Sequence, residues 1–309
     1  MPVLRDLLLA LSTNAAMRQF VISFPLSRRL SRRFVAGETL DAAIQVVKKL
    51  NRQGLEVTFD QLGENVTQES EARQAKDGYL RALDAIAANQ VKSHVSVKLT
   101  QMGLDLNSDL CLAHMRQIIA KAREAGAFVR IDMEDSARTQ ATLNIFKTLR
   151  EEFDNVGIVI QSYLYRSEGD LRALKALHAN VRLCKGAYKE PPEIAFPEKH
   201  DVDANYIQLA QIFLERNGSH GAYLALATHD ENMINWAKQY TTEHHIDRRH
   251  FEFQMLYGIR PDLQRKLAAE GYKMRVYVPY GSHWYPYFMR RLAERPANVV
   301  FLISNLFKS

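Results

Sequence analysis

Eight short apolar runs, separated by longer stretches with helical periodicity, recur along most of this 309-residue chain. The runs are rich in β-branched and aromatic residues, as buried strands are. The predicted strands are Leu55–Phe59, His94–Leu99, Phe128–Met133, Val156–Gln161, Asn180–Cys184, Ala222–Ala227, Phe251–Met255 and Met274–Val278. Helical patterns between them include Ala72–Ala88, Leu110–Ala125, Ala204–Glu215, Asn232–Tyr240 and Pro261–Ala269. Strands that alternate with helices predict a parallel sheet built from βαβ units.

The number of these units favours closure of the sheet. Eight β/α units in a chain of this length are typical of a (β/α)8 barrel of the TIM type, regular or distorted. A Rossmann fold is disfavoured, because no G-x-G-x-x-G follows the first predicted strand. No linker rich in Pro, Gly or Ser divides the chain. We therefore expect an N-terminal helical segment over residues 1–37 and one catalytic barrel over residues 38–309.

Composition places the chain among ordinary globular proteins. Its apolar fraction is 47% and its charged fraction 25%, which allows a packed core. Cys111 and Cys184 stand far apart and indicate neither a disulfide framework nor a cysteine-based zinc site. No apolar run is long enough to span a bilayer. We therefore predict a cytoplasmic protein.

The net charge of +6 is spread along the chain, with one basic cluster after the N-terminal helical pattern. The cluster consists of Arg28, Arg29, Arg32 and Arg33. It is either a solvated helix edge, which the sequence alone favours, or a contact with acidic lipids.

Polar side chains stand at or near the end of every predicted strand. In a (β/α)8 barrel the carboxyl ends of the strands meet at one face, and that face carries the active site. Lys98 and Arg182 are the most informative, because each lies in an apolar run where an unused charge is costly to bury. Asp60 and Asp230 are also explained by solvent at the strand ends. The remaining polar residues are Asp132, Glu134, Gln161, Lys185, Thr228, His229, Gln254 and Tyr277. Lysine and arginine among acids predict a site for an anionic ligand.

The segment after the last predicted strand contains the most specific pattern. Pro286 suits the first position of a helix. From there Tyr287, Arg290, Arg291 and Glu294 follow at i, i+3, i+4 and i+7, so they share one helix face. Two neighbouring guanidinium groups can clamp a carboxylate. Because an aromatic loop precedes the helix, an aromatic-walled anion pocket is favoured over a solvated polar stripe.

Several of these segments together resemble proline dehydrogenase. The matching runs are Val95–Leu99, Ile131–Glu134, Val181–Tyr188, Ala227–His229, Phe251–Gln254 and Arg275–Pro279, followed by Tyr287 and Arg290–Leu292. They come in the family's order and span about residues 38 to 305. The resemblance implies the stand-alone bacterial form, because there is no room for the aldehyde dehydrogenase or DNA-binding modules of bifunctional relatives.

The resemblance also implies a cofactor, a substrate and the residues that bind them. The cofactor is FAD, bound without a covalent link at the carboxyl ends of the strands, and the substrate is L-proline. Residues similar to the family's flavin contacts are Met133, Gln161, Arg182, Lys185, Gly186, Ala187, Thr228, His229 and Gln254. Residues similar to its proline contacts are Lys98, Leu183, Tyr277, Tyr287, Arg290 and Arg291. Lys189 departs from relatives that carry an aromatic residue after the Tyr188 position.

The implied reaction oxidises L-proline to 1-pyrroline-5-carboxylate by hydride transfer to FAD. Asp132 and Arg182 are the expected catalytic residues, and Arg182 would stabilise negative charge on the reduced flavin. Arg290 and Arg291 are expected to hold the substrate carboxylate. The family passes its electrons to a membrane quinone, which implies peripheral contact with the inner face of the cell membrane.

Two other functions remain open from the residues alone. Lys98 and Lys185 lie near strand ends, where the lysine of a Schiff-base aldolase is found. A basic module that binds nucleic acid or membrane is less favoured, because the polar residues gather at strand ends and not along one helix. No metal site and no nucleic-acid partner are expected, and the sequence leaves the oligomeric state open.

Overall fold

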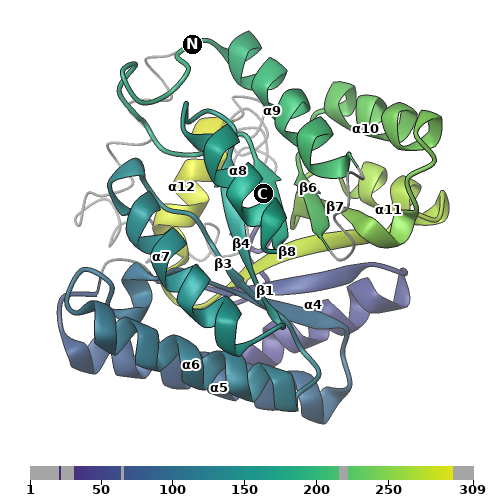
Figure 1. The fold of residues 1–309 in the computed structure, drawn as a ribbon. Coiled ribbons are helices and arrows are strands. Elements are labelled where there is room, and N and C mark those ends of the chain that lie inside the picture. Colours follow the sequence, from purple (N-terminus) through teal and green to yellow (C-terminus); the bar gives the residue numbers. More distant parts are fainter. Residues whose placement is uncertain (1–20, 22–30, 64–65, 216–221, 295–309) are drawn as a thin grey trace.

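The strands close into one parallel barrel, as the sequence predicts. The computed structural model describes residue 21 and residues 31–63, 66–215 and 222–294. In these residues, eight strands pair in sequence order and the last pairs with the first (Figure 1). They are β1 (Glu56–Gln61), β2 (Ser93–Val97), β3 (Val129–Ile131), β4 (Val156–Gln161), β5 (Asn180–Cys184), β6 (Tyr223–Ala227), β7 (Phe251–Leu256) and β8 (Met274–Tyr280).

The described helices lie between and around the strands in the sequence, and all but the last cover the outer wall. They are α4 (Leu40–Arg52), α5 (Glu69–Asn89), α6 (Ser108–Glu124), α7 (Ser136–Glu152), α8 (Ser167–Ala176), α9 (Lys199–Leu214), α10 (Glu231–Glu243), α11 (Pro261–Ala269) and α12 (Trp284–Glu294), with 3-10 turns at Thr100–Met102 and Arg248–His250. Side chains of Asn107 and Asp230 accept backbone N–H groups and so fix where α6 and α10 begin. None of the described helices is long and apolar enough to cross a bilayer.

The barrel departs from the regular TIM pattern at the helix after β8. On the barrel wall α4 packs against β1 and β8, where a regular barrel would have its last helix. Side chains of α12 instead form a cluster with Leu62, which follows β1, and Ile259, which follows β7. Helix α12 therefore lies over the carboxyl ends of the strands (Figure 1). It begins at Trp284, so Pro286 is its third residue, still within the first turn, whose N–H groups have no partner in the helix.

The predicted N-terminal helical segment over residues 1–37 lies largely outside the described residues, as do Arg28 and Arg29. Two predicted strands are shorter than expected at their carboxyl ends. The chain leaves β2 at Val97, so Lys98 and Leu99 are outside the strand, and it leaves β3 at Ile131. Lys98 and Asp132 are therefore the first residues beyond their strands, where side chains can reach across the barrel mouth.

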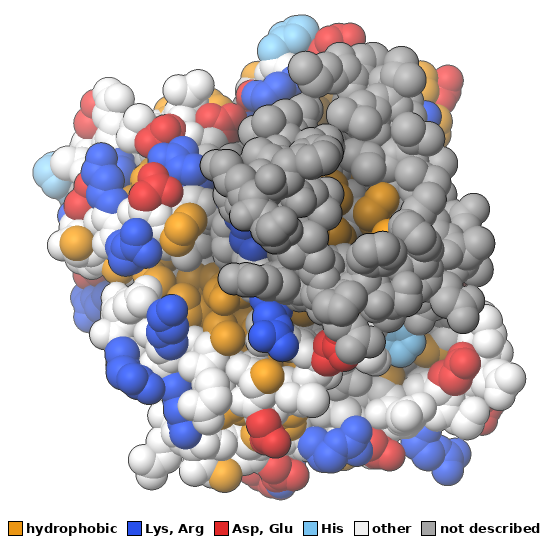
Figure 2. All heavy atoms as spheres, turned by 180° about the vertical axis from the view of Figure 1, so that it is seen from behind, with side chains coloured by type: hydrophobic (Ala, Val, Ile, Leu, Met, Phe, Trp, Pro, Cys, Tyr) orange, Lys and Arg blue, Asp and Glu red, His pale blue; other side chains and the backbone are white. Residues whose placement is uncertain are grey.

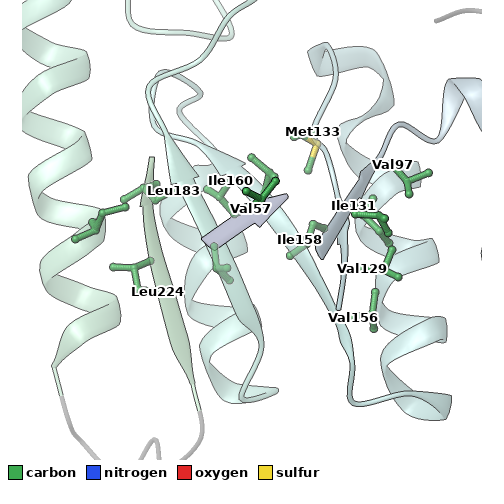
Figure 3. Close-up of a cluster of buried hydrophobic side chains, with 14 of the residues drawn as sticks. Val57, Val97, Val129, Ile131, Met133, Val156, Ile158, Ile160, Leu183 and Leu224 are labelled. Atoms are coloured by element: carbon green, nitrogen blue, oxygen red, sulfur yellow. The ribbon is translucent and has the colours of Figure 1, made fainter. Parts of the chain in front are cut away.

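The main apolar core lies between the barrel and its helices. Successive side chains of a strand point to opposite faces, and every second residue of these strands is apolar and faces the helices. Figure 3 shows part of this layer, in which no labelled strand residue is more than 2% exposed. These residues are Val57, Val97, Val129, Ile131, Val156, Ile158, Ile160, Leu183 and Leu224.

The barrel interior is lined by polar and charged side chains. Near the amino ends of the strands, Arg275 and Glu252 are 1% and 2% exposed, and the Nε of Arg275 lies 2.8 Å from the Oε1 of Glu252. The Tyr223 hydroxyl donates to the Oε2 of Glu252 at 3.0 Å. Arg130 donates to backbone carbonyls of neighbouring strands, and a Cβ at Gly157 would come within 2.6 Å of its NH1. These groups form what we call the barrel floor, in which Glu252 is ion-paired with Arg275 and the guanidinium of Arg130 is held by carbonyl oxygens.

Candidate active site

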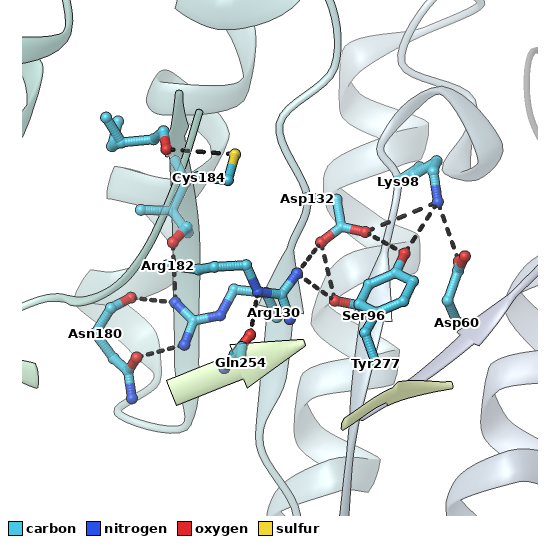
Figure 4. Close-up of polar contacts among 12 residues, drawn as sticks. Asp60, Ser96, Lys98, Arg130, Asp132, Asn180, Arg182, Cys184, Gln254 and Tyr277 are labelled. Carbon is cyan, nitrogen blue, oxygen red and sulfur yellow. Dashed lines mark hydrogen bonds and ion pairs between the residues drawn. The ribbon is translucent and has the colours of Figure 1, made fainter. Parts of the chain in front are cut away.

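A network of ionised and hydroxyl groups occupies the barrel mouth, with Asp132 at its centre (Figure 4). The Oδ1 of Asp132 accepts from the NH1 of Arg182 at 2.6 Å and from the Ser96 hydroxyl at 2.9 Å. Its Oδ2 accepts from the Tyr277 hydroxyl at 2.9 Å and lies 3.8 Å from the Nζ of Lys98. Asp132 is 8% exposed, so these contacts form in a largely dry environment. The barrel thus brings together Lys98, Asp132, Arg182 and Tyr277, which the sequence predicted for one site.

Lys98 has a second acidic partner in Asp60, whose polarity was also explained by solvent at a strand end. Its Nζ lies 3.1 Å from the Oδ1 of Asp60, and Asp60 is 1% exposed instead of being solvated at a strand end. Burial raises the pKa of the Asp60 carboxyl, while the charge of Lys98 acts in the opposite direction. The inward position of Asp60 could have been inferred from the two-residue alternation of β1, since Val57 and Phe59 face the helices.

Arg182 is held from both sides. In addition to its contacts with Asp132 and Ser96, its Nε donates to the Oε1 of Gln254 at 2.6 Å. Its Cζ lies 5.3 Å from the centre of the Tyr277 ring, a distance that allows a cation–π contact. Its NH2 group makes no hydrogen bond to any of the described residues. The guanidinium is therefore fixed by the protein while retaining donors for a ligand.

The other residues that resemble flavin contacts lie at the ends of β3 to β7. The Nε2 of Gln161 donates to the carbonyl of Glu134 at 2.9 Å. The Nε2 of His229 accepts the N–H of Leu256 at 2.9 Å, which places the proton of the neutral ring on Nδ1. Thr228 is buried in the same turn, and Met133 is 6% exposed at the edge of the apolar core.

A cavity of about 350 Å³ lies between the loop after β5 and α12. Of the predicted residues, Lys185, Gly186, Ala187 and Arg290 line it. The other lining residues are Tyr163, Tyr188, Pro197, Lys199, Val202 and Ala293. This rim cavity therefore receives side chains from two segments that the sequence separates by about a hundred residues.

Lysine and aspartate side chains pair at the edge of the rim cavity. The Nζ of Lys185 lies 2.7 Å from the Oδ2 of Asp230 and 2.5 Å from the Oδ1 of Asp203. Lys199 pairs with the same two acids. Burial opposes ionisation of Asp203, but hydrogen bonds from the two lysines hold its pKa below the usual value. Lys199 was not predicted, because it stands outside every matched run and carries no pattern of its own.

Helix α12 presents the predicted aromatic and basic stripe. The Cζ of Arg291 lies 5.0 Å from the centre of the Tyr287 ring, so these two side chains share one face of the helix. Tyr287 is 6% exposed, and Arg290 reaches the rim cavity. Both arginines therefore lie at the same end of the barrel as Lys98 and Arg182.

Leu183 is placed differently from the other predicted substrate contacts. It follows Arg182 directly in β5, and alternation turns it to the opposite face of the strand. There it is fully buried in the layer between barrel and helices (Figure 3). The expectation that Leu183 contributes to the wall of a substrate pocket does not fit this position.

A closed parallel barrel whose buried ionised groups converge at the carboxyl ends of its strands has the architecture of a (β/α)8-barrel enzyme. In the described residues, no three His, Cys, Asp or Glu side chains come together as a metal site requires.

Comparisons with known proteins identify the family. The model of the proline dehydrogenase family matches residues 43–304. The chain is 46% identical to proline dehydrogenase 1 of Bacillus subtilis, over 99% of this chain and 100% of that protein. It is also 46% identical to the proline dehydrogenase of Deinococcus radiodurans, over 90% of each chain. The chain belongs to the proline dehydrogenase family, which confirms the resemblance, and it matches the stand-alone relatives along their length.

Solved structures agree with this assignment. Proline utilization A (PutA) from Bdellovibrio bacteriovorus, inactivated by N-propargylglycine, superposes with a TM-score of 0.81 at 28% identity. The match covers 87% of this chain and 33% of the PutA chain, so this protein spans about a third of that one. A second PutA structure, with proline bound in remote sites, gives a TM-score of 0.74 at 25% identity.

Proposed function

We propose that this protein oxidises L-proline to 1-pyrroline-5-carboxylate with FAD as its cofactor. The observation that supports this proposal most is the meeting of Lys98, Asp132, Arg182 and Tyr277 in one buried network at the barrel mouth. The proposal also follows from the family, whose relatives named above are proline dehydrogenases.

The cationic groups around the mouth suit a substrate that carries a carboxylate. Arg290 and Arg291 on α12 can supply bidentate donors, and Lys98 adds a point charge. The rings of Tyr277 and Tyr287 offer apolar surface for the pyrrolidine ring and exclude water. Held in this way, the substrate reacts in an effectively unimolecular step.

The chemistry of the rim suits FAD. A diphosphate is anionic, and Lys185 and Lys199 line the rim cavity, while Gln161, His229 and Gln254 can hydrogen bond to a heterocycle. When bound, FAD would supply the two-electron acceptor for the hydride that leaves the ring carbon next to nitrogen. Arg182 would place positive charge where negative charge develops.

Formation of the carbon–nitrogen double bond also releases the proton of the ring nitrogen. Two pairs at the mouth can carry a proton, Lys98 with Asp60 and Tyr277 with Asp132. A Schiff-base mechanism is a weaker candidate, because the amine of such a lysine must be neutral. Here the Nζ of Lys98 is ion-paired with two carboxylates.

A membrane quinone as electron acceptor, and a cytoplasmic protein that contacts the inner face of the membrane, are also part of this proposal. Arg32 and Arg33 of the basic cluster are exposed. On part of the face in Figure 2, lysine and arginine side chains lie beside hydrophobic ones, with acidic side chains among them, and the basic ones could contact acidic lipids. No nucleic-acid partner is proposed.

The visible spectrum of the purified protein tests the central claim. We expect a yellow protein whose flavin absorbance disappears when L-proline is added without oxygen, and D-proline serves as the control. A colourless protein that takes up no FAD would exclude the proposed reaction. Covalent trapping by borohydride with a carbonyl substrate would support the aldolase instead. N-propargylglycine, which inactivated PutA, is expected to cause time-dependent loss of activity here.

A further inference from the structure

We propose that Glu252 is a positioning residue for Arg182, acting through the side-chain amide of Gln254. The inference rests on the proposed function, since it concerns the guanidinium that would face the flavin. Glu252 and Gln254 are two residues apart on β7, so both side chains point into the barrel. Glu252 belongs to the barrel floor, and Gln254 stands between it and the mouth.

The carboxylate of Glu252 determines which way the amide of Gln254 points. A glutamine can present either its oxygen or its NH2 group to a neighbour. A carboxylate only accepts, and the Nε2 of Gln254 donates to the Oε1 of Glu252 at 2.5 Å. The Oε1 of Gln254 must therefore face the other way, where it accepts from the Nε of Arg182 at 2.6 Å.

Glu252 is itself rigidly held as an anion. The Nε of Arg275 donates to its Oε1 at 2.8 Å, and the NH2 of Arg275 and the hydroxyl of Tyr223 both donate to its Oε2. Burial opposes ionisation, but the charge and hydrogen bonds of Arg275 hold the pKa of Glu252 well below its usual range. The carboxylate thus keeps its charge and its direction throughout the neutral pH range.

As a consequence, the plane of the Arg182 guanidinium is fixed. Gln254 receives its Nε on one side, and Asp132 receives its NH1 on the other at 2.6 Å. Two acceptors on different edges leave the guanidinium one orientation, which is what preorganised stabilisation of a developing charge requires. If the amide of Gln254 were reversed, its NH2 group would face the Nε–H of Arg182. Both groups are donors, so this hydrogen bond would be lost.

The Glu252→Gln variant tests this role. We expect its kcat to fall by about tenfold, the order expected for a partly misplaced donor. The KM for L-proline should stay within about twofold, since the carboxylate grip is elsewhere. The reduction potential of the bound flavin should become more negative, because Arg182 stabilises the reduced form less.

Two further variants separate positioning from mere structural support. Glu56→Gln removes the other carboxylate that pairs with Arg275 but does not touch Gln254, so kcat and potential should stay as in the wild type. The exchange Glu252→Gln with Gln254→Glu restores an acceptor for Arg182 and a donor–acceptor match between positions 252 and 254. It should recover kcat to within about threefold of the wild type.

The proposal is overturned if Glu252→Gln retains the wild-type kcat and potential, if Glu56→Gln lowers both equally, or if the exchanged pair binds FAD without recovering kcat. If Glu252→Gln does not fold, Glu252→Asp tests the same contact, because it keeps the charge that pairs with Arg275 and withdraws the carboxylate from Gln254. It should lower kcat and potential without lowering the melting temperature by more than a few degrees. A wild-type protein that binds no FAD would instead refute the proposed function, which keeps the two failures distinct.

Discussion

The barrel strands have one face toward the surrounding helices and one toward the barrel axis, and the two differ in polarity and in what they contribute to stability. On β7, Phe251 and Phe253 face the helices and are 1% and 0% exposed, while Glu252 and Gln254 face the axis. Burial of a large apolar side chain contributes about 1.5–3 kcal/mol to folding. A buried ion pair contributes little net stability, because desolvation of both charges offsets their attraction. The outer face therefore stabilises the fold. The buried charges of the inner face add little stability, and their presence is explained by their role in positioning the groups of the active site.

The largest expected effect is on the outer face. Phe253→Ala removes a buried ring that packs against Tyr272 with the ring centres 5.3 Å apart. We expect the free energy of unfolding to fall by about 3–5 kcal/mol, measured by denaturant titration. At temperatures where the variant is folded, kcat/KM should change by less than about threefold. A folded but inactive variant would contradict the division between the two faces.

The next effect is on the inner face. Arg182→Lys keeps the charge, but a lysine cannot meet Gln254 and Asp132 at once with a planar fork. We expect kcat/KM to fall about a hundredfold, with the flavin affinity or potential altered more than the affinity for proline. Stopped-flow reduction and a potential titration measure these quantities. Should proline affinity change more than the flavin properties, the role of Arg182 has been assigned to the wrong ligand.

A third variant tests α12, which lies over the barrel mouth and belongs to neither face of the strands. Arg290→Met should raise the apparent KM for L-proline by about tenfold to a hundredfold, since a charge-assisted hydrogen bond contributes about 1.5–3 kcal/mol. The flavin should stay bound, as its absorbance after gel filtration will show. Arg290→Lys is the matched control and should lose less. Unchanged kinetics would remove the carboxylate grip from the mechanism.

The smallest effect concerns pH. Partly buried His94 lies at the amino end of β2, where burial and the positive charges of Arg275 and Arg130 hold its pKa well below the ordinary value. The unfolded chain takes up a proton near pH 6.5 and the folded one does not, so stability falls as the pH drops below about 6.5. Between pH 6.5 and 5.5 the loss should be about 1 kcal/mol.

Melting temperatures at these two pH values measure the effect. His94→Asn removes this contribution, so its melting temperature should depend less on pH than that of the wild type. Equal slopes for both proteins would mean that His94 takes up a proton as readily in the folded protein as in the unfolded chain, which contradicts the prediction.

The difference between the two faces also explains why the sequence predicts the fold more completely than the contacts within the site. Short apolar runs rich in β-branched residues predict the strands, helical periodicity predicts the helices between them, and the number of these units predicts the closed barrel. Whether a polar member such as Asp60 is solvated or buried depends on which strand closes next to which. The same closure brings Lys98 within 3.1 Å of Asp60, from 38 residues away in sequence.

Leu183 was misplaced, and Glu252 and Lys199 were given no role, for physical reasons of the same kind. Leu183 was assigned to the substrate because it stands inside a matching run, although alternation turns it away from Arg182. The pairing of Glu252 with Arg275 follows from the neighbouring positions of β7 and β8 on a closed sheet. Lys199 is the first residue of α9, and only the path of the loop after β5 brings it to the rim cavity beside α12.

The position of α12 separates two kinds of evolutionary change. The arginines proposed to hold the substrate stand on one short stretch beyond the last strand, whereas the Asp132 network draws on side chains from β2, β5 and β8. A single segmental replacement could therefore alter which imino acids are accepted. A new redox partner would demand concerted mutation at several distant positions. Chimaeras that exchange only residues 281–294 between relatives should inherit the preference of the donor and the electron chemistry of the host.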